Sequence, residues 1–257
     1  MPEGPEVKLI VQKISKIFRD SELYNIKINS GRYKTGKKPN GYDIFLKGLP
    51  AKIKNFHTHG KFIWIVLDNN SYIWITLGLT GMLEIIKNKH SHLTFETSKG
   101  DFYMSDMRNF GTIKFSLSED ELKKKIKQLG FDPLKKNFTQ DEFIHKIRKL
   151  KNDKIIGQVL NDQKVIAGIG NYLRAEVLYS AKISPYRKLK DLSDQDLENL
   201  YQNIIKITNK SYNKQLKDGL HTYNFQVYKR SKTINNENVV GNKFGERTLW
   251  WVPGIQK

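Results

Sequence analysis

The chain has 257 residues, enough for one or two domains with cores of their own. Its 45 Lys and Arg residues outnumber 26 Asp and Glu, and the formal net charge of +19 favours nucleic acid over an anionic membrane surface as partner. The absence of cysteine excludes disulfides and cysteine-bound zinc, and no apolar run approaches the ~20 residues of a membrane span.

The first residues combine two groups that can carry out chemistry. Removal of Met1 would expose Pro2, whose secondary amine titrates near ~7.7–8.0 and is partly unprotonated and nucleophilic at neutral pH. Glu3 places a carboxyl group beside it. Apolar residues from Val7 to Phe18 recur at helical spacing, so the positive end of a helix faces both groups. The ordinary alternative is a Met-Pro start followed by an acidic residue that complements the helix dipole.

Short apolar alternations between residues 22 and 115 predict an antiparallel β-sandwich or barrel. Turn sequences rich in Asn and Gly separate the alternations. The predicted strands are 23–29, 43–46, 51–56, 61–67, 72–77, 82–86, 93–97, 101–104 and 112–115.

The pattern becomes helical after residue 115. Capping-box sequences begin at Ser118, Thr139 and Ser193, and Gly219 is expected to end the last helix. The predicted helices are 140–150, 153–161, 171–181 and 194–216, and the tail from residue 221 predicts one β-hairpin. We therefore predict an α+β protein with a β-sandwich domain (1–118), a linker (119–138), a helical domain (139–220) and a hairpin (221–257).

The stretch from Gln158 to Glu176 contains a glycine-rich turn between two helices. Gly168 and Gly170 leave backbone N–H groups accessible, and Asn171 is predicted to cap the following helix. A helix N-terminus with open N–H groups is a natural phosphate site. Taken alone, the same pattern also fits a plain interhelical turn.

Several stretches in chain order resemble the formamidopyrimidine-DNA glycosylase / endonuclease VIII family (Fpg/Nei). They are Met-Pro-Glu-Gly-Pro-Glu at 1–6, the loops 77–82 and 105–111, the stretch 158–176, and the tail segments 225–230 and 245–256. The resemblance spans nearly the whole chain. It implies an N-terminal antiparallel β-sandwich with an N-terminal helix, then a helix–two-turn–helix domain carrying a β-hairpin finger.

The resemblance implies a bifunctional DNA glycosylase and abasic-site lyase of base excision repair. Pro2 would attack the sugar C1′ and form a Schiff base, Glu3 would donate or relay a proton, and Glu6 would support them. β- and then δ-elimination would break the strand without a cofactor. Lys61 would contact the phosphate beside the lesion, where the alternative is a solvated residue at a strand edge.

The family pattern also implies which residues hold the DNA backbone. Asn171 and the amides of Gly168 and Gly170 would grip the backbone beside the damaged nucleotide. Arg247 would contact the phosphate of the flipped nucleotide.

Three further residues match loops that fill the space left by a flipped base. They are Leu79, Arg108 and Phe110. An apolar wedge restores stacking and an arginine offers a planar set of donors to the orphaned base. For Leu79 and Phe110 the alternative is ordinary core packing.

The tail departs from the family's zinc finger. Where that finger ends Cys-Pro-x-Cys-Gln, this chain reads Val252-Pro-Gly-Ile-Gln256, which supplies no thiolate or imidazole. We expect a zincless finger packed by its tryptophan and aliphatic side chains. The pairs His57/His59 and His90/His92 each alternate along a predicted strand, and we interpret them as strand histidines rather than metal ligands.

Substrate preference follows from one short connection. Only eight residues, 220–227, separate Gly219 from the sequence Tyr228-Lys-Arg230. This leaves no room for a long lesion-binding loop. We therefore expect oxidised pyrimidines and ring-opened or further-oxidised purines. The expected partner is damaged DNA, double- or single-stranded, bound by an intracellular monomer, and the alternative is a non-catalytic damaged-DNA or RNA binding protein with the same fold.

Overall fold

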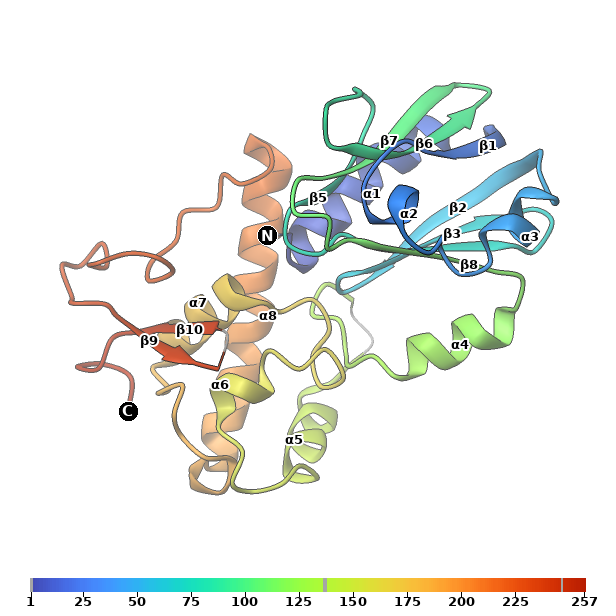
Figure 1. Ribbon diagram of the computed structural model, residues 1–257. Helices are drawn as coiled ribbons and strands as arrows, with labels where there is room; N and C mark the ends of the chain where they lie inside the picture. Colours follow the sequence, from blue (N-terminus) through green and yellow to red (C-terminus); the bar gives the residue numbers. More distant parts are fainter. Residues whose placement is uncertain (1, 136–137, 246) are drawn as a thin grey trace. The chain divides into compact units, whose positions relative to one another are not determined.

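The computed structural model describes residues 2–135, 138–245 and 247–257, which form two compact units (Figure 1). Among the described residues, unit 1 comprises Pro2 and residues 6–128, and unit 2 comprises residues 3–5 and those after 128. The chain therefore passes through unit 2 at its third to fifth residues before it builds unit 1. The α+β class is confirmed, with an antiparallel sandwich in unit 1 and helices in unit 2.

Unit 1 is built from eight antiparallel strands in the order β5-β7-β6-β1-β2-β3-β4-β8. The strands are β1 (Glu22–Ile28), β2 (Ala51–His59), β3 (Phe62–Leu67), β4 (Tyr72–Thr76), β5 (Gly81–Glu84), β6 (Ser91–Thr97), β7 (Gly100–Asp106) and β8 (Thr112–Ser116). β1 pairs with β2 only through Glu22↔Lys52 and Leu23↔Ala51. The sheet therefore opens into two four-stranded layers on either side of that junction.

Helix α1 (Gly4–Phe18) packs its apolar stripe into the core of unit 1, as its spacing predicts. Phe18, at the end of α1, lies with its ring 4.9 Å from that of Phe102 on β7. Phe102 stacks on Phe95 of β6 at 4.4 Å and meets Phe56 of β2 edge-on at 6.2 Å. The aromatic cluster joins α1 to both layers and so fixes the helix that follows the chain terminus.

The predicted strand at 43–46 is wrong, because these residues form helix α3 (Tyr42–Leu46). Gly41, with φ +77°, turns the chain into the helix, and Tyr42 and Phe45 are both buried at a spacing of three residues. A run of four or five residues fits a helical period and a strand period equally well. The short helix α2 (Arg32–Thr35) was not predicted, whereas α4 (Glu119–Lys127) begins at Ser118 as its sequence indicates.

Unit 2 is organised around two long helices. Its elements are α5 (Gln140–Arg148), α6 (Ile156–Val159), α7 (Asn171–Ala181), the 3-10 turn η1 (Leu189–Asp191), α8 (Asp194–Asp218), β9 (Val240–Phe244) and β10 (Arg247–Trp251). α7 has the predicted bounds, and Gly219 ends α8 as predicted. α6 is much shorter than the predicted 153–161.

The capping predictions hold at two of three helices. Thr139 and Ser193 form complete capping boxes, in which the N-cap hydroxyl and the third helical residue exchange hydrogen bonds. Ser118 accepts from the Glu121 N–H, but the Glu121 carboxylate binds Lys114 and Ser116 instead. The box at α4 is therefore only half formed.

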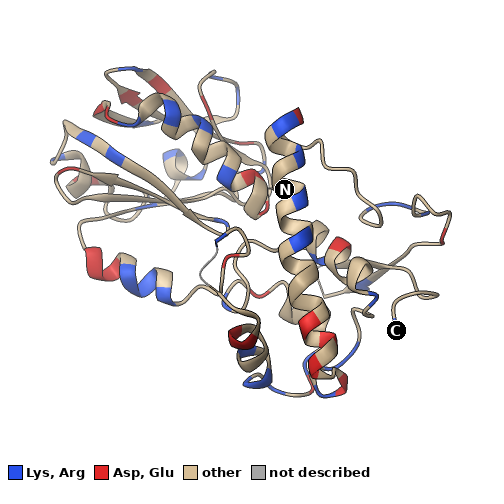
Figure 2. Ribbon diagram, turned by 180° about the vertical axis from the view of Figure 1, so that it is seen from behind, with Lys and Arg blue, Asp and Glu red and all other residues tan. Residues whose placement is uncertain are grey.

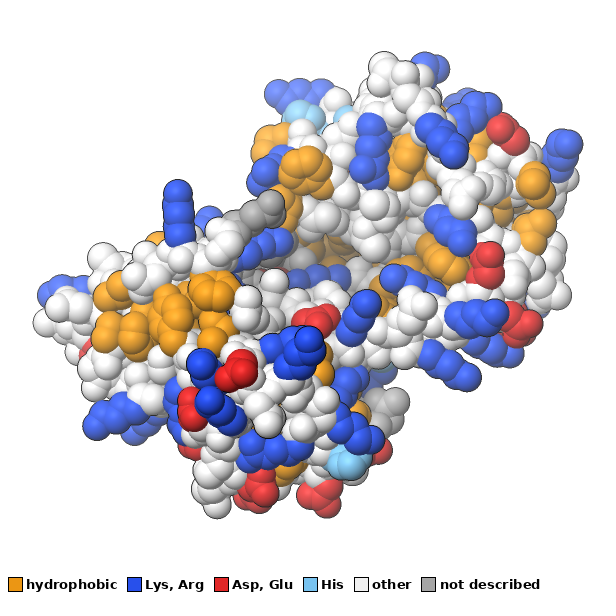
Figure 3. Space-filling model, turned by 60° about the horizontal axis from the view of Figure 1, so that its bottom comes forward, with side chains coloured by type: hydrophobic (Ala, Val, Ile, Leu, Met, Phe, Trp, Pro, Cys, Tyr) orange, Lys and Arg blue, Asp and Glu red, His pale blue; other side chains and the backbone are white. Residues whose placement is uncertain are grey.

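Lys and Arg residues recur along α1, α4 and α8 (Figure 2, blue). On the face shown in Figure 3, blue Lys and Arg side chains cover both units and acidic side chains are fewer. Within residues 2–135, 138–245 and 247–257, no helix has the combined length and apolar character needed to cross a membrane.

Truncation of the central ring of unit 1 should destabilise this unit strongly. We expect Phe102→Ala to lower the free energy of unfolding by about 3–5 kcal/mol, because it leaves a cavity between α1 and both layers. Urea denaturation measures the loss. Ile86→Ala, at a side chain that is 73% exposed, is the matched control and should change stability by less than about 0.5 kcal/mol. Equal effects of the two substitutions would contradict the assignment of Phe102 to the core.

Candidate active site and phosphate-binding surface

The carboxylate of Glu3 caps helix α7. Glu3 is 1% exposed, and its Oε2 accepts from the N–H of Gly170 at 2.6 Å and of Leu173 at 3.2 Å. Its Oε1 accepts from the N–H of Tyr172 at 2.9 Å. Three N–H donors at the positive end of a helix stabilise a negatively charged carboxylate. The predicted catalytic acid is thereby attached to the predicted glycine-rich turn.

Two glycines allow the chain terminus to approach this turn. The N–H of Gly4 donates to the carbonyl of Gly168 at 2.8 Å, and a Cβ on Gly4 would lie 3.2 Å from the Gly168 Cα. Gly168 itself has φ +99°, a conformation that favours glycine. The side chain of Gln163 holds the turn by accepting from the Gly168 N–H at 2.9 Å and donating to the Ile169 carbonyl at 2.7 Å.

These contacts correct the predicted roles of the two glycine amides. The N–H of Gly168 donates to Gln163 and that of Gly170 donates to Glu3, so both are engaged inside unit 2. Their geometry does not support a direct grip on phosphate. The glycines instead let Glu3 and Asn171 come together at the start of α7.

Asn171 does not cap α7 as predicted. The N-cap position belongs to Gly170, and the capping acceptor is the carboxylate of Glu3. The Asn171 side chain instead accepts through Oδ1 from Nη2 of Arg174. Burial raises the pKa of the Tyr228 phenol, and a hydrogen bond with Asn171 acts in the opposite direction. Asn171 therefore lies between Arg174 and Tyr228, two residues that the sequence did not single out.

Side chains of α7 hold the tail segment that carries the hairpin. Arg174 makes a longer contact of 3.4 Å from Nη2 to the carbonyl of Thr248 on β10. The Tyr179 hydroxyl donates to Glu237 at 2.6 Å. The carboxylate of Glu176 accepts three main-chain N–H groups, those of Gln226 (2.8 Å), Val227 (3.0 Å) and Tyr228 (3.0 Å). Burial raises the pKa of the Glu176 carboxyl, and these three donors oppose that effect.

Gln256 attaches the tail to the segment after α7. Gln256 is 2% exposed, accepts from the Val252 N–H at 2.7 Å and donates to the Ile183 carbonyl at 2.9 Å. In the first half of the finger, the Thr233 hydroxyl donates to Glu237 at 2.7 Å. Among the residues that the structure describes, no group of three or more His, Asp or Glu is placed to hold a metal ion.

In unit 1, Asp106 holds together the two loops predicted to enter DNA. Its carboxylate is 2% exposed and accepts from the Thr80 hydroxyl, from the Arg108 N–H at 3.2 Å and from the Gly111 N–H at 2.6 Å. Burial by itself would raise the pKa of Asp106, but these donors and the Phe110 N–H outweigh it and hold the pKa below its usual range. The sequence did offer one signal for this role, an acidic residue directly before the Met-Arg-Asn-Phe-Gly loop.

The loop side chains are presented to solvent rather than to the core. Phe110 is 52% exposed, and the Arg108 guanidinium lies 4.8 Å from the centre of its ring. Leu79 is partly exposed in the turn after β4, and Met107 beside them is 63% exposed. The core-packing alternative is therefore wrong for Phe110 and does not describe Leu79.

The other predicted catalytic residues belong to unit 1. Pro2 is buried directly before α1, and Glu6 is 3% exposed in the first turn of that helix. Lys61 lies in the two-residue turn between β2 and β3, where Gly60 has φ +56°. Met1, whose removal the mechanism requires, lies outside the described residues. The candidates thus form one set on unit 1 and another on unit 2, linked covalently by the Pro2–Glu3 peptide bond.

The histidines have structural partners. His57 stacks on Trp64 with ring centres 5.1 Å apart. The His92 ring nitrogens lie 2.8 Å from the Ser30 hydroxyl and 2.8 Å from the Asp106 carbonyl oxygen. His90 lies in the turn before β6, so the predicted pairing of His90 and His92 on one strand is wrong.

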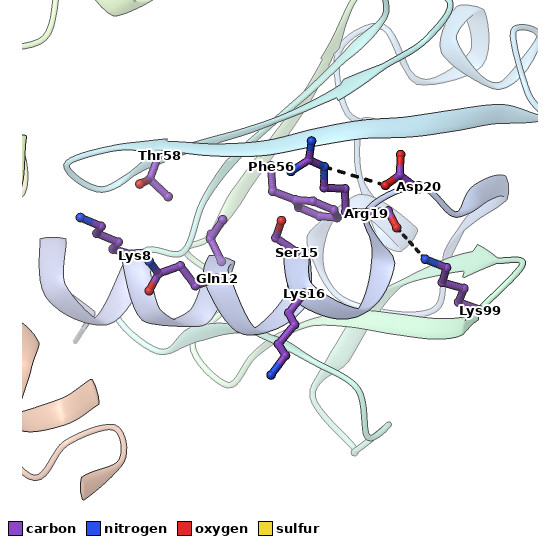
Figure 4. Close-up of a pocket in the computed structure, with 10 residues that line it drawn as sticks. Lys8, Gln12, Ser15, Lys16, Arg19, Asp20, Phe56, Thr58 and Lys99 are labelled. Atoms are coloured by element: carbon purple, nitrogen blue, oxygen red, sulfur yellow. Dashed lines mark hydrogen bonds and ion pairs between the residues drawn. The ribbon is translucent and has the colours of Figure 1, made fainter. Parts of the chain in front are cut away.

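A separate cavity of about 530 Å³ lies beside α1 in unit 1 (Figure 4). Figure 4 shows the side chains of Lys8, Gln12 and Lys16 on successive turns of α1, with Phe56 and Thr58 of β2 nearby. Basic side chains line this cavity, and none of the predicted catalytic residues is among its lining residues.

Comparisons with known proteins agree with this architecture. The model of the formamidopyrimidine-DNA glycosylase N-terminal domain matches residues 1–113, and that of the H2TH domain matches residues 129–221. The formamidopyrimidine-DNA glycosylase of Wolbachia sp. subsp. Brugia malayi is 30% identical over 210 residues, covering 79% of this chain and 75% of that protein. The corresponding protein of Prochlorococcus marinus is 27% identical, with all of both chains covered.

A solved structure has the same fold throughout. It is a complex between Lactococcus lactis Fpg and a DNA containing an oxidised pyrimidine, with a TM-score of 0.85, 23% identity and full coverage of both chains. The fold and the relatives define a two-unit protein with an N-terminal sandwich and a helix–two-turn–helix unit. The chain belongs to the formamidopyrimidine-DNA glycosylase family.

The capping role of Glu3 can be tested by an isosteric substitution. Glu3→Gln replaces one accepting oxygen by an NH₂ group and leaves at least one N–H of α7 unpaired, which costs about 1–3 kcal/mol. We expect urea denaturation to show that loss in unit 2. Asp141→Asn, at an exposed acidic residue in the first turn of α5, is the control and should have little effect. Unchanged stability of Glu3→Gln would disprove the capping role.

Proposed function

We propose that this protein is a DNA glycosylase of base excision repair that removes oxidised bases and then cleaves the strand at the abasic site. The observation that carries the proposal is the attachment of the Pro2–Glu3 terminus to the first turn of α7 through three hydrogen bonds. A nucleic-acid binding protein alone has no need of that arrangement. Family membership and the net charge of +19 support the same conclusion, which places the protein with the DNA of the cell.

The chemistry begins at the imino nitrogen of Pro2, once Met1 has been removed. Its lone pair forms a bond to C1′ of the flipped nucleotide, and the glycosidic electron pair leaves with the damaged base. The sugar ring then opens at the C1′–O4′ bond to give an iminium ion, and O4′ takes a proton. Glu3, stabilised as a carboxylate by α7, first accepts the proton lost from the Pro2 nitrogen and then passes it on. Glu6 is buried close by in sequence and supports this transfer.

The iminium ion makes the protons at C2′ acidic. Loss of one of them drives β-elimination, which breaks the C3′–O bond and releases the 3′-side strand. A second elimination, of the δ type, breaks the C5′–O bond. Water then hydrolyses the imine and regenerates Pro2, so the cycle needs no cofactor.

Phosphate contacts come from both units in this proposal. Asn171 and Arg247 of unit 2 bind the backbone of the flipped nucleotide, and Lys61 of unit 1 binds the neighbouring phosphate. In unit 1, Phe110 and Leu79 replace the lost base stacking, and Arg108 donates to the orphaned base. The partial exposure of these side chains supports a role in binding rather than in the core.

The substrate preference rests on the short connection after α8. The end of residues 220–227 is held by Glu176, which accepts from the N–H groups of Gln226, Val227 and the following Tyr228. This segment therefore has little freedom to form a long loop over a base. We propose oxidised pyrimidines and ring-opened or further-oxidised purines as substrates. Bases in single-stranded or bubble DNA are also accessible, because an unpaired base costs less to flip.

The covalent step predicts an adduct that borohydride can trap. With an oligonucleotide containing an oxidised pyrimidine or an abasic site, we expect the reduced imine to yield a stable protein–DNA complex on a denaturing gel. Pro2→Gly should weaken or abolish it, because the secondary amine is lost. Lys61→Ala is the control, since weaker phosphate binding lowers the yield without removing the nucleophile. A wild-type protein that gives no adduct on any such substrate would instead be a non-catalytic nucleic-acid binding protein.

We also propose that the hairpin finger functions without zinc. The support is the pair of polar closures at its two halves, Thr233 with Glu237 and Gln256 with Val252 and Ile183. Hydrogen bonds and apolar packing of Val252 there replace the role of metal ligands.

Metal removal tests this proposal directly. We expect far less than one zinc per chain by elemental analysis, and no change in melting temperature or imine trapping after treatment with EDTA. Gln256→Ala should in contrast lower stability by about 1–3 kcal/mol, because it leaves the Val252 N–H and Ile183 carbonyl unpaired. Stoichiometric zinc in the purified protein would refute the metal-free finger.

A further inference from the structure

Arg174 is a buried cation that contacts three separate segments of unit 2. It is 3% exposed, and its Nη1 donates to the carbonyl of Gly157 on α6 at 2.9 Å. Its Nη2 donates to Oδ1 of Asn171 and lies 3.4 Å from the carbonyl oxygen of Thr248 on β10. Burial lowers the pKa of Arg174 to about 10, so the group stays charged at neutral pH. A buried charge is costly unless hydrogen bonds compensate it, and these acceptors supply that compensation.

The contact with Asn171 fixes which way that side-chain amide points. A guanidinium has only donors, so the atom of Asn171 that faces it must be the carbonyl oxygen. The NH₂ group of Asn171 is then directed away from Arg174, and one of its two N–H donors serves the phenol oxygen of Tyr228. Phosphate oxygens are acceptors, so the orientation imposed by Arg174 is the one that can bind the DNA backbone.

The same guanidinium also reaches the hairpin. Thr248 follows Arg247 directly in β10, and the contact with the Thr248 carbonyl ties this strand to the start of α7. The positive charge of Arg247 is close enough to contribute to the lowered pKa of Arg174. Two neighbouring cations and an oriented amide therefore face the same part of unit 2.

We propose that Arg174 is a positioning residue that orients the side-chain amide of Asn171 for phosphate binding. This inference rests on the proposed function, because it assumes that Asn171 binds the DNA backbone. Arg174 acts through Asn171 and need not touch DNA. Its loss should therefore weaken binding only while Asn171 is present.

A double-mutant cycle tests this coupling. The four proteins are wild type, Arg174→Met, Asn171→Ala and the double variant, each measured for Kd on a duplex with a stable abasic-site analogue and for kcat and KM on a lesion duplex. We expect Arg174→Met to raise Kd and KM roughly tenfold, the value of one charged hydrogen bond, with kcat nearly unchanged. In the Asn171→Ala background, the same substitution should change Kd less than about twofold.

Two further variants separate positioning from folding. Ser180→Ala removes another side-chain hydrogen bond of α7, to Asn203 on α8, and should leave KM unchanged. Arg174→Lys keeps the charge and N–H donors but loses the planar guanidinium, so it should recover part of the lost affinity. If Arg174→Met does not fold, as judged by circular dichroism, the cycle is completed with Arg174→Lys, for which a several-fold loss is expected only while Asn171 is present.

The outcomes distinguish this inference from the proposed function. If Asn171→Ala raises Kd but substitution of Arg174 leaves it unchanged, or raises it equally in both backgrounds, the positioning role is overturned and the phosphate contact stands. If Asn171→Ala itself has no effect on Kd, both the phosphate contact and the role of Arg174 are overturned. Imine trapping by wild type in either case tests the catalytic proposal independently.

Discussion

The contact between the Glu3 carboxylate and the first turn of α7 is the interaction on which the candidate site depends. Chain termini usually fray because few groups hold them. Here a buried carboxylate satisfies three N–H groups that α7 cannot satisfy itself, and the helix in turn holds the carboxylate beside Pro2. Separation of Glu3 from α7 would leave both the carboxylate and the N–H groups of the helix buried and unpaired, which costs free energy. The segment that carries the proposed nucleophile is thereby made part of the folded structure.

Helix α7 serves unit 2 as a scaffold as well as a binding surface. Its first turn receives Glu3, and Arg174, Glu176 and Tyr179 hold successive parts of the tail. A small hairpin has too little core to be stable alone. Hydrogen bonds to the side chains of α7 restrain the tail segment that carries the hairpin. The buried polar side chains of α7, such as Arg174 and Glu176, therefore have hydrogen-bond partners in the tail, which explains why polar residues occur at buried positions of this helix.

A buried carboxylate also organises the loops of unit 1. Asp106 accepts hydrogen bonds from both loops, so Leu79 and Phe110, the proposed wedge residues, lie on loops that share one buried acceptor. A wedge that replaces a flipped base must be in place before the base leaves, because reordering a loop at that moment would add an entropic cost. Phe110 is therefore exposed on a loop that hydrogen bonds to Asp106 hold in place.

The sequence by itself determined the elements that have a clear period and local caps. α1, α7 and α8, all eight strands of unit 1 and the hairpin follow from apolar spacing. Thr139 and Ser193 begin their helices by exchanging hydrogen bonds with residues three positions later. The order of motifs determined the family. Only the tertiary structure decided that 43–46 is a helix, that Glu3 rather than Asn171 caps α7, and that Arg174 and Asp106 belong to the site. The partners in the Glu3–Gly170 contact are 167 residues apart, and local patterns carry no information on pairs that only the packing of distant segments brings together.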